Sequence, residues 1–129
     1  MSNSILIVDD SDALRRLIRF CIEHSTPWQV CGEAENGVDA VEKVKALHPD
    51  MVILDFQMPV MNGLEAARQI ARMAPNTAMV MFTLHDSAEL SEQAQAVGIQ
   101  HVISKTDRFA GRLIAALRNA LESPARTAN

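Results

Sequence analysis

The sequence lacks the features that would assign it to a membrane or to a secreted scaffold. Its 129 residues include only two cysteines, Cys21 and Cys31, too few for a disulfide framework, and we expect both to be buried as small apolar side chains. The longest uninterrupted apolar runs, such as Ala78–Phe82, have five residues, far short of the roughly 20 residues that a membrane helix needs. The amino-terminal residues show neither a basic segment nor a long apolar stretch, so we expect no signal peptide, no membrane insertion and a cytoplasmic location.

Charge and histidine content argue against two further classes. The chain carries 16 acidic and 12 basic residues, whereas binding to nucleic acid phosphates favours a basic face, so direct contact with nucleic acid is not expected. The four histidines are scattered, and only His24 has helical spacing from a cysteine, so no zinc site is expected. Hydrophobic residues make up 48% of the chain and charged residues 22%, which is typical of one globular domain of this length.

Predicted strands and helices alternate along the whole chain. The predicted strands are Ser4–Val8, Trp28–Glu35, Met51–Leu54, Ala78–Phe82 and His101–Ser104. The first predicted helix begins at Ser11 or Asp12 and ends before Pro27. The other predicted helices span Val38–Leu47, Gly63–Met73, Ser87–Val97 and Arg108–Leu121. Asn36-Gly37 is predicted to form a turn and Gly98 a left-handed helix cap. Strict alternation predicts an α/β fold with a doubly wound parallel sheet over residues 4–122, followed by a flexible tail at 123–129.

The helical periodicity predicts which side chains enter the core. In the first helix the apolar face is expected to consist of Leu14, Leu17, Ile18, Cys21 and Ile22. The other side of this helix carries Arg15, Arg16 and Arg19. The corresponding apolar residues are Val41, Val44 and Leu47 in the second helix and Leu113, Ile114 and Leu117 in the last.

Charged or hydroxyl side chains follow four of the five predicted strands. Asp9 and Asp10 come directly after the first strand, Asp55 after the third, Thr83 after the fourth and Lys105 after the fifth. A single aspartate at such a position is commonly a cap or a turn residue. Because the carboxyl ends of parallel strands meet at one edge, where open α/β sheets bind their ligands, we expect these side chains to converge on one site.

The expected cluster has a defined chemical requirement. Carboxylates packed together raise one another's pKa unless a cation joins them, and Mg²⁺ (or Mn²⁺) suits a site of carboxylate oxygens. An ammonium and a hydroxyl add a positive charge and a hydrogen-bond donor for a tetrahedral oxyanion. An aspartate carboxylate can attack phosphorus to form an acyl phosphate, so the sequence predicts phosphoryl chemistry at this edge.

Four segments resemble the receiver domain of bacterial two-component response regulators. They are Ile5–Asp10 (ILIVDD), Val52–Gly63 (VILDFQMPVMNG), Val80–Thr83 (VMFT) and Val102–Lys105 (VISK). The resemblance extends over residues 4–122 and implies a flavodoxin-like (βα)5 fold with strand order 2-1-3-4-5. It implies a signalling protein, similar to single-domain chemotaxis regulators, whose only chemistry is self-catalysed phosphoryl transfer and autodephosphorylation.

The resemblance implies a role for each residue of the acidic cluster. Asp55 is then the phosphoacceptor and a ligand of Mg²⁺. Asp10 binds the ion directly, and Asp9 binds it through water. The backbone carbonyl of Gln57 is a further implied ligand, so the identity of the Gln57 side chain need not affect metal binding.

The resemblance also implies how the site is phosphorylated and read. Lys105 pairs with the phosphoryl group, and Thr83 moves inward to hydrogen-bond it, pulling the following loop along. The phosphodonor is implied to be a sensor histidine kinase or a phosphotransfer protein that docks near the first helix and the loop after the fifth strand. A downstream protein partner is implied to bind the surface formed by the fourth helix, fifth strand and fifth helix. The polar residues of the fourth and fifth helices either support a phosphorylation-dependent dimer or face water.

Several positions depart from the pattern of the family. The usual aromatic switch residue is replaced by Val102, which either packs in its strand or changes the gating, with His101 as a candidate polar substitute. Lys105 is not followed by the frequent proline, so no cis-proline turn is expected. Gln57 and His85 occupy positions that border the phosphoryl group in the family, where they either tune its lifetime or are solvated loop side chains.

Three alternatives remain open at this point. An aspartate-nucleophile phosphatase of haloacid dehalogenase type uses similar residues, but it places its nucleophile after the first strand, with a second aspartate two residues on. A flavodoxin-like cofactor binder needs a phosphate loop after the first strand, where Asp9 and Asp10 would repel phosphate. A degenerate receiver would act only as an interaction module. The length leaves no room for an output domain, so we expect either a natural single-domain regulator or an excised receiver, and favour the former.

Overall fold

The structure, a computed structural model, describes residues 3–84, 86–106 and 108–122 and has the predicted alternation of strands and helices. In chain order the elements are β1 (Ser4–Val8), α1 (Asp12–Ser25), β2 (Gln29–Ala34), α2 (Gly37–Leu47), β3 (Met51–Leu54), α3 (Gly63–Met73), β4 (Ala78–Thr83), α4 (Ala88–Ala96), β5 (His101–Ser104) and α5 (Phe109–Glu122). All strand pairs are parallel, in the order β2-β1-β3-β4-β5, which confirms the predicted doubly wound fold. The predicted tail at 123–129 lies outside the described residues.

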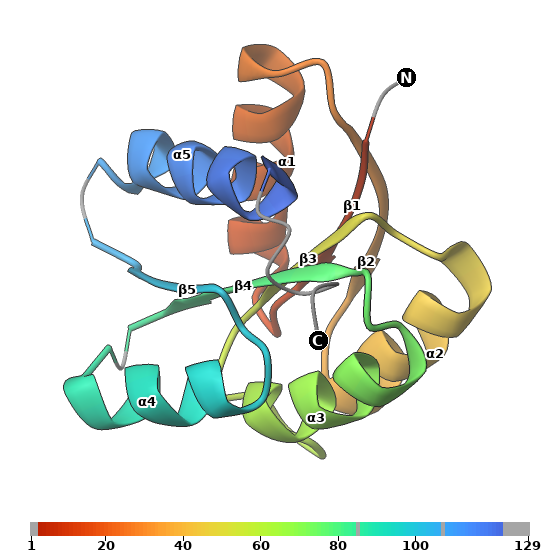
Figure 1. Ribbon diagram of the computed structural model, residues 1–129. Coiled ribbons are helices and arrows are strands. Elements are labelled where there is room, and N and C mark those ends of the chain that lie inside the picture. Colours follow the sequence, from red (N-terminus) through yellow and green to blue (C-terminus); the bar gives the residue numbers. More distant parts are fainter. Residues whose placement is uncertain (1–2, 85, 107, 123–129) are drawn as a thin grey trace.

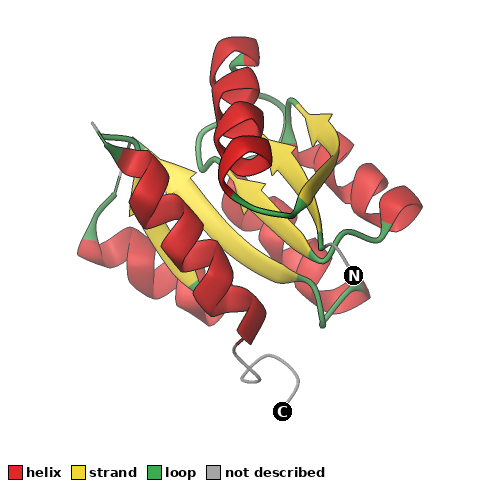
Figure 2. Ribbon diagram, turned by 90° about the horizontal axis from the view of Figure 1, so that it is seen from above, coloured by secondary structure: helices red, strands yellow, loops and turns green. Residues whose placement is uncertain are grey.

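Two helical layers enclose the sheet. Helices α1 and α5 cover one face, and α2, α3 and α4 cover the other (Figure 1). Viewed from above, the twisted sheet runs between these layers (Figure 2). None of the helices in the described part of the chain is long and apolar enough to cross a membrane.

The central strands are apolar because both of their faces are covered. In β1, Ile5 and Ile7 pack with α1 and α5, while Leu6 and Val8 pack with the opposite layer. This follows from the two-residue period of a strand, which sends successive side chains to opposite faces. The edge strand β2 tolerates polar residues such as Glu33, which is only partly buried. Every residue of β3 and β4, by contrast, is buried.

Side-chain caps begin four of the helices. Ser11, Asn36, Asn62 and Ser87 each accept a hydrogen bond from a backbone N–H in the first turn of the helix that follows. The predicted Asn36-Gly37 turn is therefore wrong, because the Asn36 amide oxygen caps α2 and Gly37 is already helical. The prediction for Gly98 is correct, since its φ of 98° lies in the left-handed region.

Some predicted core residues are more exposed than their periodicity indicated. Leu17 of α1 is 46% exposed and Leu47 of α2 is 42% exposed. Cys21 and Cys31 are only partly buried. In α1 the fully buried stripe is limited to Ile18 and Ile22, because a helix that packs on a sheet buries only the centre of its apolar face.

The helix α5 contains a glycine whose replacement should stabilise the protein. A Cβ added at Gly111 would meet no atom within 4 Å, so Gly111→Ala is expected to increase the free energy of unfolding by roughly 0.5–1 kcal/mol through helix propensity. Urea denaturation measures this change. Gly63→Ala is the matched control and should destabilise, because its Cβ would collide with the Asp55 carbonyl oxygen. A destabilised Gly111→Ala variant would contradict the expectation.

Candidate functional site

Three carboxylates meet at the carboxyl ends of β1 and β3. One oxygen from each of Asp9, Asp10 and Asp55 lies within 4.8 Å of the others. The sheet register brings them together, because Val8 pairs with Leu54 and the next residue of each strand is an aspartate. Asp9 is 2% exposed and Asp55 is 6% exposed. The cluster therefore combines two buried carboxylates with the exposed one of Asp10 at its mouth.

A single lysine partly neutralises this cluster. The Nζ atom of Lys105 lies 2.7 Å from Asp9 Oδ2 and 3.3 Å from Asp55 Oδ2, and its side chain is 12% exposed. One ammonium among three carboxylates leaves an excess of negative charge. Hard divalent cations such as Mg²⁺ prefer oxygen ligands of this kind, so the donor set fits such an ion.

The environment of Asp55 opposes its negative charge. Burial, and then the neighbouring Asp9 carboxylate, raise the pKa of Asp55 above its ordinary value, while Lys105 acts in the opposite direction. The attraction of Lys105 does not fully offset burial and repulsion. A cation that joins the carboxylates would favour the ionised form of Asp55, which is the form that can act as a nucleophile.

Thr83 lies at the same edge of the sheet and is fully buried at the end of β4. Its backbone carbonyl accepts a hydrogen bond of 2.9 Å from the N–H of Lys105. The backbone of Thr83 thus holds the backbone of the lysine that contacts both buried aspartates. A displacement of the chain at the end of β4 would act directly on Lys105.

The loop between β3 and α3 closes tightly over the end of β3. The Gly63 N–H donates to the Phe56 carbonyl at 2.8 Å, and a Cβ at position 63 would collide with the Asp55 carbonyl oxygen. Val60 has a φ of 72°, which is strained for a β-branched residue. Gln57 belongs to this loop, and its side chain is exposed. The role of its backbone carbonyl as a metal ligand stays a prediction.

The remaining residues predicted to act at or near the site are Val102, His101 and His85. Val102 is partly buried in β5 and packs against the core between the sheet and the α2, α3 and α4 layer. His101 is also partly buried. His85 lies outside the described residues. No cis peptide bond occurs among the residues that the structure describes.

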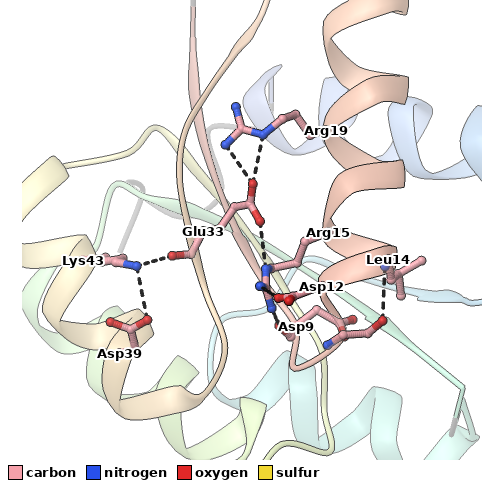
Figure 3. A network of polar contacts seen from close by, with 9 residues as sticks. Asp9, Asp12, Leu14, Arg15, Arg19, Glu33, Asp39 and Lys43 are labelled. Carbon is pink, nitrogen blue, oxygen red and sulfur yellow. Dashed lines mark hydrogen bonds and ion pairs between the residues drawn. The ribbon is translucent and has the colours of Figure 1, made fainter.

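Sequence reasoning missed one residue beside the site. Arg15 was expected on the outer side of the first helix, but its side chain is only 11% exposed. Its Nη1 donates to the Asp9 carbonyl oxygen at 2.5 Å, and its Nε donates to Glu33 at 2.8 Å (Figure 3). An arginine on the flank of an amphipathic helix is ordinarily solvated, and the sequence alone carried no signal of these long-range partners.

The fold and this edge of the sheet define a class of protein. A doubly wound parallel sheet with three carboxylates, a threonine and a lysine at its carboxyl edge is the arrangement that the sequence motifs implied for receiver domains of two-component signalling. The chain belongs to this family, because the family model described as the response regulator receiver domain matches residues 5–118.

Individual relatives agree with this assignment. The chain is 35% identical over 105 residues to the chemotaxis protein CheY of Halobacterium salinarum, which covers 81% of this chain and 86% of that protein. It is 47% identical over 79 residues to protein-glutamate methylesterase/protein-glutamine glutaminase 1 of Methanosarcina acetivorans, covering 61% of this chain but only 23% of that protein. The solved response regulator domain of Thermotoga maritima CheB superposes with a TM-score of 0.89 at 30% identity, covering 95% of this chain and 98% of that one.

Replacing the buried carboxylate should stabilise the metal-free protein. Because the pKa of Asp55 is raised in the folded state, ionisation of this group lowers the free energy of unfolding at pH values above the raised pKa. Asp55→Asn removes this penalty and is expected to increase the free energy of unfolding at pH 7 in EDTA, by on the order of 1 kcal/mol.

Urea denaturation at several pH values tests this expectation. The difference between Asp55→Asn and wild type should fall toward zero below the ordinary carboxyl pKa of 3.8, where Asp55 is protonated in both folded and unfolded states. Asp39→Asn, in the first turn of α2, is the control for removing one carboxylate that is not part of the cluster. A less stable Asp55→Asn protein at pH 7 would show that Lys105 outweighs burial.

Proposed function

We propose that this chain is a phosphoacceptor receiver in which Asp55 takes a phosphoryl group from the phosphohistidine of a sensor histidine kinase or phosphotransfer protein. The observation that carries the proposal is the arrangement of a buried Asp55 carboxylate with Asp9, Asp10 and Lys105 around it. In this proposal Asp9, Asp10, Asp55 and the Gln57 carbonyl hold Mg²⁺ or Mn²⁺. The ion, when bound, supplies positive charge for the phosphoryl oxygens.

The positions of two side chains support the proposed transfer step. A carboxylate oxygen of Asp55 attacks phosphorus, the new O–P bond forms, and the P–N bond to the donor breaks with its electron pair returning to the imidazole. Lys105 Nζ lies 3.3 Å from Asp55 Oδ2 before transfer and therefore needs only a small movement to reach a phosphoryl oxygen. This movement would weaken its contact with Asp9, which is 2.7 Å in the present state.

The connection between β4 and β5 supports the proposed switch. The Thr83 hydroxyl is proposed to donate to the phosphoryl group, and its backbone contact with Lys105 carries the displacement to the end of β5. Val102 replaces the aromatic switch residue of the family, so the movement of Thr83 gates no large ring here. His101, the preceding residue of β5, is the candidate polar reporter.

The surface formed by α4, β5 and α5 is the proposed site for a downstream protein partner or for a second phosphorylated copy. A hollow of about 140 Å³ lies between α4 and β5 and is lined by Ser91, Gln95, Ile99, Gln100, His101 and Val102. In the part of the chain that the structure describes, the buried Gln100 Oε1 beside this hollow has no hydrogen-bond partner. We propose a cytoplasmic location, where such kinases and partners meet their regulators.

Intact mass after incubation with Mg²⁺ and acetyl phosphate tests the phosphoacceptor role. The wild type should gain one phosphoryl group, and both Asp55→Asn and EDTA should abolish the gain. Asp39→Asn, which keeps Asp55, should be phosphorylated as the wild type is. Turnover of a phosphate ester without an adduct would favour the phosphatase alternative, and the absence of both adduct and turnover would favour a degenerate receiver.

The exposed Gln57 side chain should influence the lifetime of the phosphoryl group. Because Gln57 lies in the loop directly after Asp55, its amide is proposed to hinder the water that attacks the acyl phosphate. Gln57→Ala is expected to accelerate loss of phosphoryl by roughly 3–10-fold, the effect of one hydrogen bond worth about 0.5–1.5 kcal/mol. The decay of the phosphorylated mass measures the rate. An unchanged rate would reject the role, and a slower one would mean that the amide orients the water.

A further inference from the structure

Arg15 is the one arginine of α1 that joins the acidic site to a neighbouring strand. Its guanidinium contacts the Asp9 carbonyl oxygen at 2.5 Å, Glu33 Oε1 at 2.8 Å and the Asp12 carboxylate (Figure 3). These partners belong to the end of β1, to β2 and to the first turn of α1. At 11% exposure, Arg15 is more buried than Arg19, which is 36% exposed. A planar guanidinium has several donors in fixed directions, which lets it bridge partners of this kind.

Glu33 holds the guanidinium in place. Its carboxylate accepts from Arg15 through Oε1 and from Arg19 through Oε2, while its backbone carbonyl accepts from Lys43. Although burial raises the pKa of Glu33, the hydrogen bonds from Arg15 and Arg19 outweigh this effect and keep the pKa below its ordinary value. The carboxylate is thus ionised at neutral pH and bound from two sides, so it serves as a fixed anchor.

Arg15, held by Glu33, contacts the backbone of Asp9 at the carbonyl oxygen. The Asp9 N–H donates to the Ala34 carbonyl at 3.0 Å, and its carboxylate accepts from the Ser11 N–H at 2.9 Å and from Lys105 at 2.7 Å. Its carbonyl, which begins the peptide leading to Asp10, accepts from Arg15. Because Asp10 follows directly on this peptide, the orientation of the peptide sets the direction in which its exposed side chain leaves the backbone.

We propose that Arg15 is a positioning residue that fixes the Asp9–Asp10 peptide and thereby orients both carboxylates for a divalent cation. The inference rests on the proposed function, because it assumes that the cluster binds Mg²⁺. Arg15 touches neither the ion nor the phosphoryl group in this proposal. It acts through Asp9, as the outer hydrogen-bond partners of metal ligands do elsewhere.

The sign of the effect separates positioning from simple electrostatics. A positive charge close to the cluster repels a second cation, so if only its charge mattered, removing Arg15 would tighten Mg²⁺ binding. If Arg15 orients the ligands, its removal weakens binding instead. Arg19 offers a matched control, since it carries the same charge and shares Glu33, and the described contacts include none between Arg19 and Asp9.

Calorimetric titration with Mg²⁺ measures the first consequence. Arg15→Gln is expected to raise the dissociation constant about tenfold, in line with losses of roughly 10–100-fold for outer-sphere partners. Arg15→Lys keeps the charge but loses the planar guanidinium, whose separate Nη1 and Nε groups reach Asp9 and Glu33, so it should recover only part of the loss. Arg19→Gln should stay within about twofold of the wild type, because Arg15 keeps its contacts with both Asp9 and Glu33 in this variant.

Hydrogen exchange of the Ser11 amide provides a second readout that needs no metal. This N–H donates to the Asp9 carboxylate, so its exchange in EDTA should become faster in Arg15→Gln and remain unchanged in Arg19→Gln. If Arg15→Gln fails to fold by circular dichroism, Glu33→Gln replaces it, since it weakens the anchor while retaining Arg15. The exchange of the Ser11 amide then decides, because loss of the Glu33 charge would by itself weaken Mg²⁺ binding, and a smaller acceleration than in Arg15→Gln is expected.

The outcomes distinguish this inference from the proposed function. If the wild type binds no Mg²⁺ in the millimolar range, the proposed function fails, and the exchange of Ser11 alone decides whether Arg15 holds Asp9. If the wild type binds Mg²⁺, a dissociation constant for Arg15→Gln at or below the wild-type value overturns the proposal. An unchanged exchange rate of Ser11 in Arg15→Gln also overturns it.

Discussion

The repulsion among three carboxylates, held in check by one lysine, is the constraint on which the rest of the site depends. Two of these carboxylates, from Asp9 and Asp55, are buried at the ends of adjacent central strands, where neither can move away from the other. Lys105 reaches them from beyond the edge strand β5 and contacts both. The arrangement is compatible with folding because hydrophobic helices on both faces of the sheet supply the stability that the charges oppose.

The same constraint explains how the site can be sensitive to added charge. A cation or a phosphoryl group placed among these residues changes which pairs attract, and Lys105 has two alternative partners a few ångströms apart. Its backbone N–H is bound to the Thr83 carbonyl, so a change in the position of the lysine involves the ends of both β4 and β5. On the opposite side of the cluster, Arg15 and Glu33 connect the Asp9 backbone to α1 and β2.

Much of this could be predicted from the sequence, and the errors have physical reasons. The order of strands and helices was predictable because the apolar run of a buried strand ends sharply, as at Val8 to Asp9, and a segment with helical period follows it. The Asn36-Gly37 turn was wrong because asparagine caps helices as readily as it forms turns. The exposure of Leu17 was missed because periodicity gives the direction of a side chain on its helix, but not how far the neighbouring layer extends.

The sequence by itself determined the alternation of elements and the residue type at the end of each strand, since both depend on local pattern. Because parallel strands share an edge, it also determined that Asp9, Asp55, Thr83 and Lys105 come to one side of the sheet. Only the tertiary structure decided that Lys105 pairs more closely with Asp9 than with Asp55, and that Arg15 turns inward to the Asp9 carbonyl. Such contacts join residues from different elements, and their geometry depends on register, twist and layer packing, which no local pattern encodes.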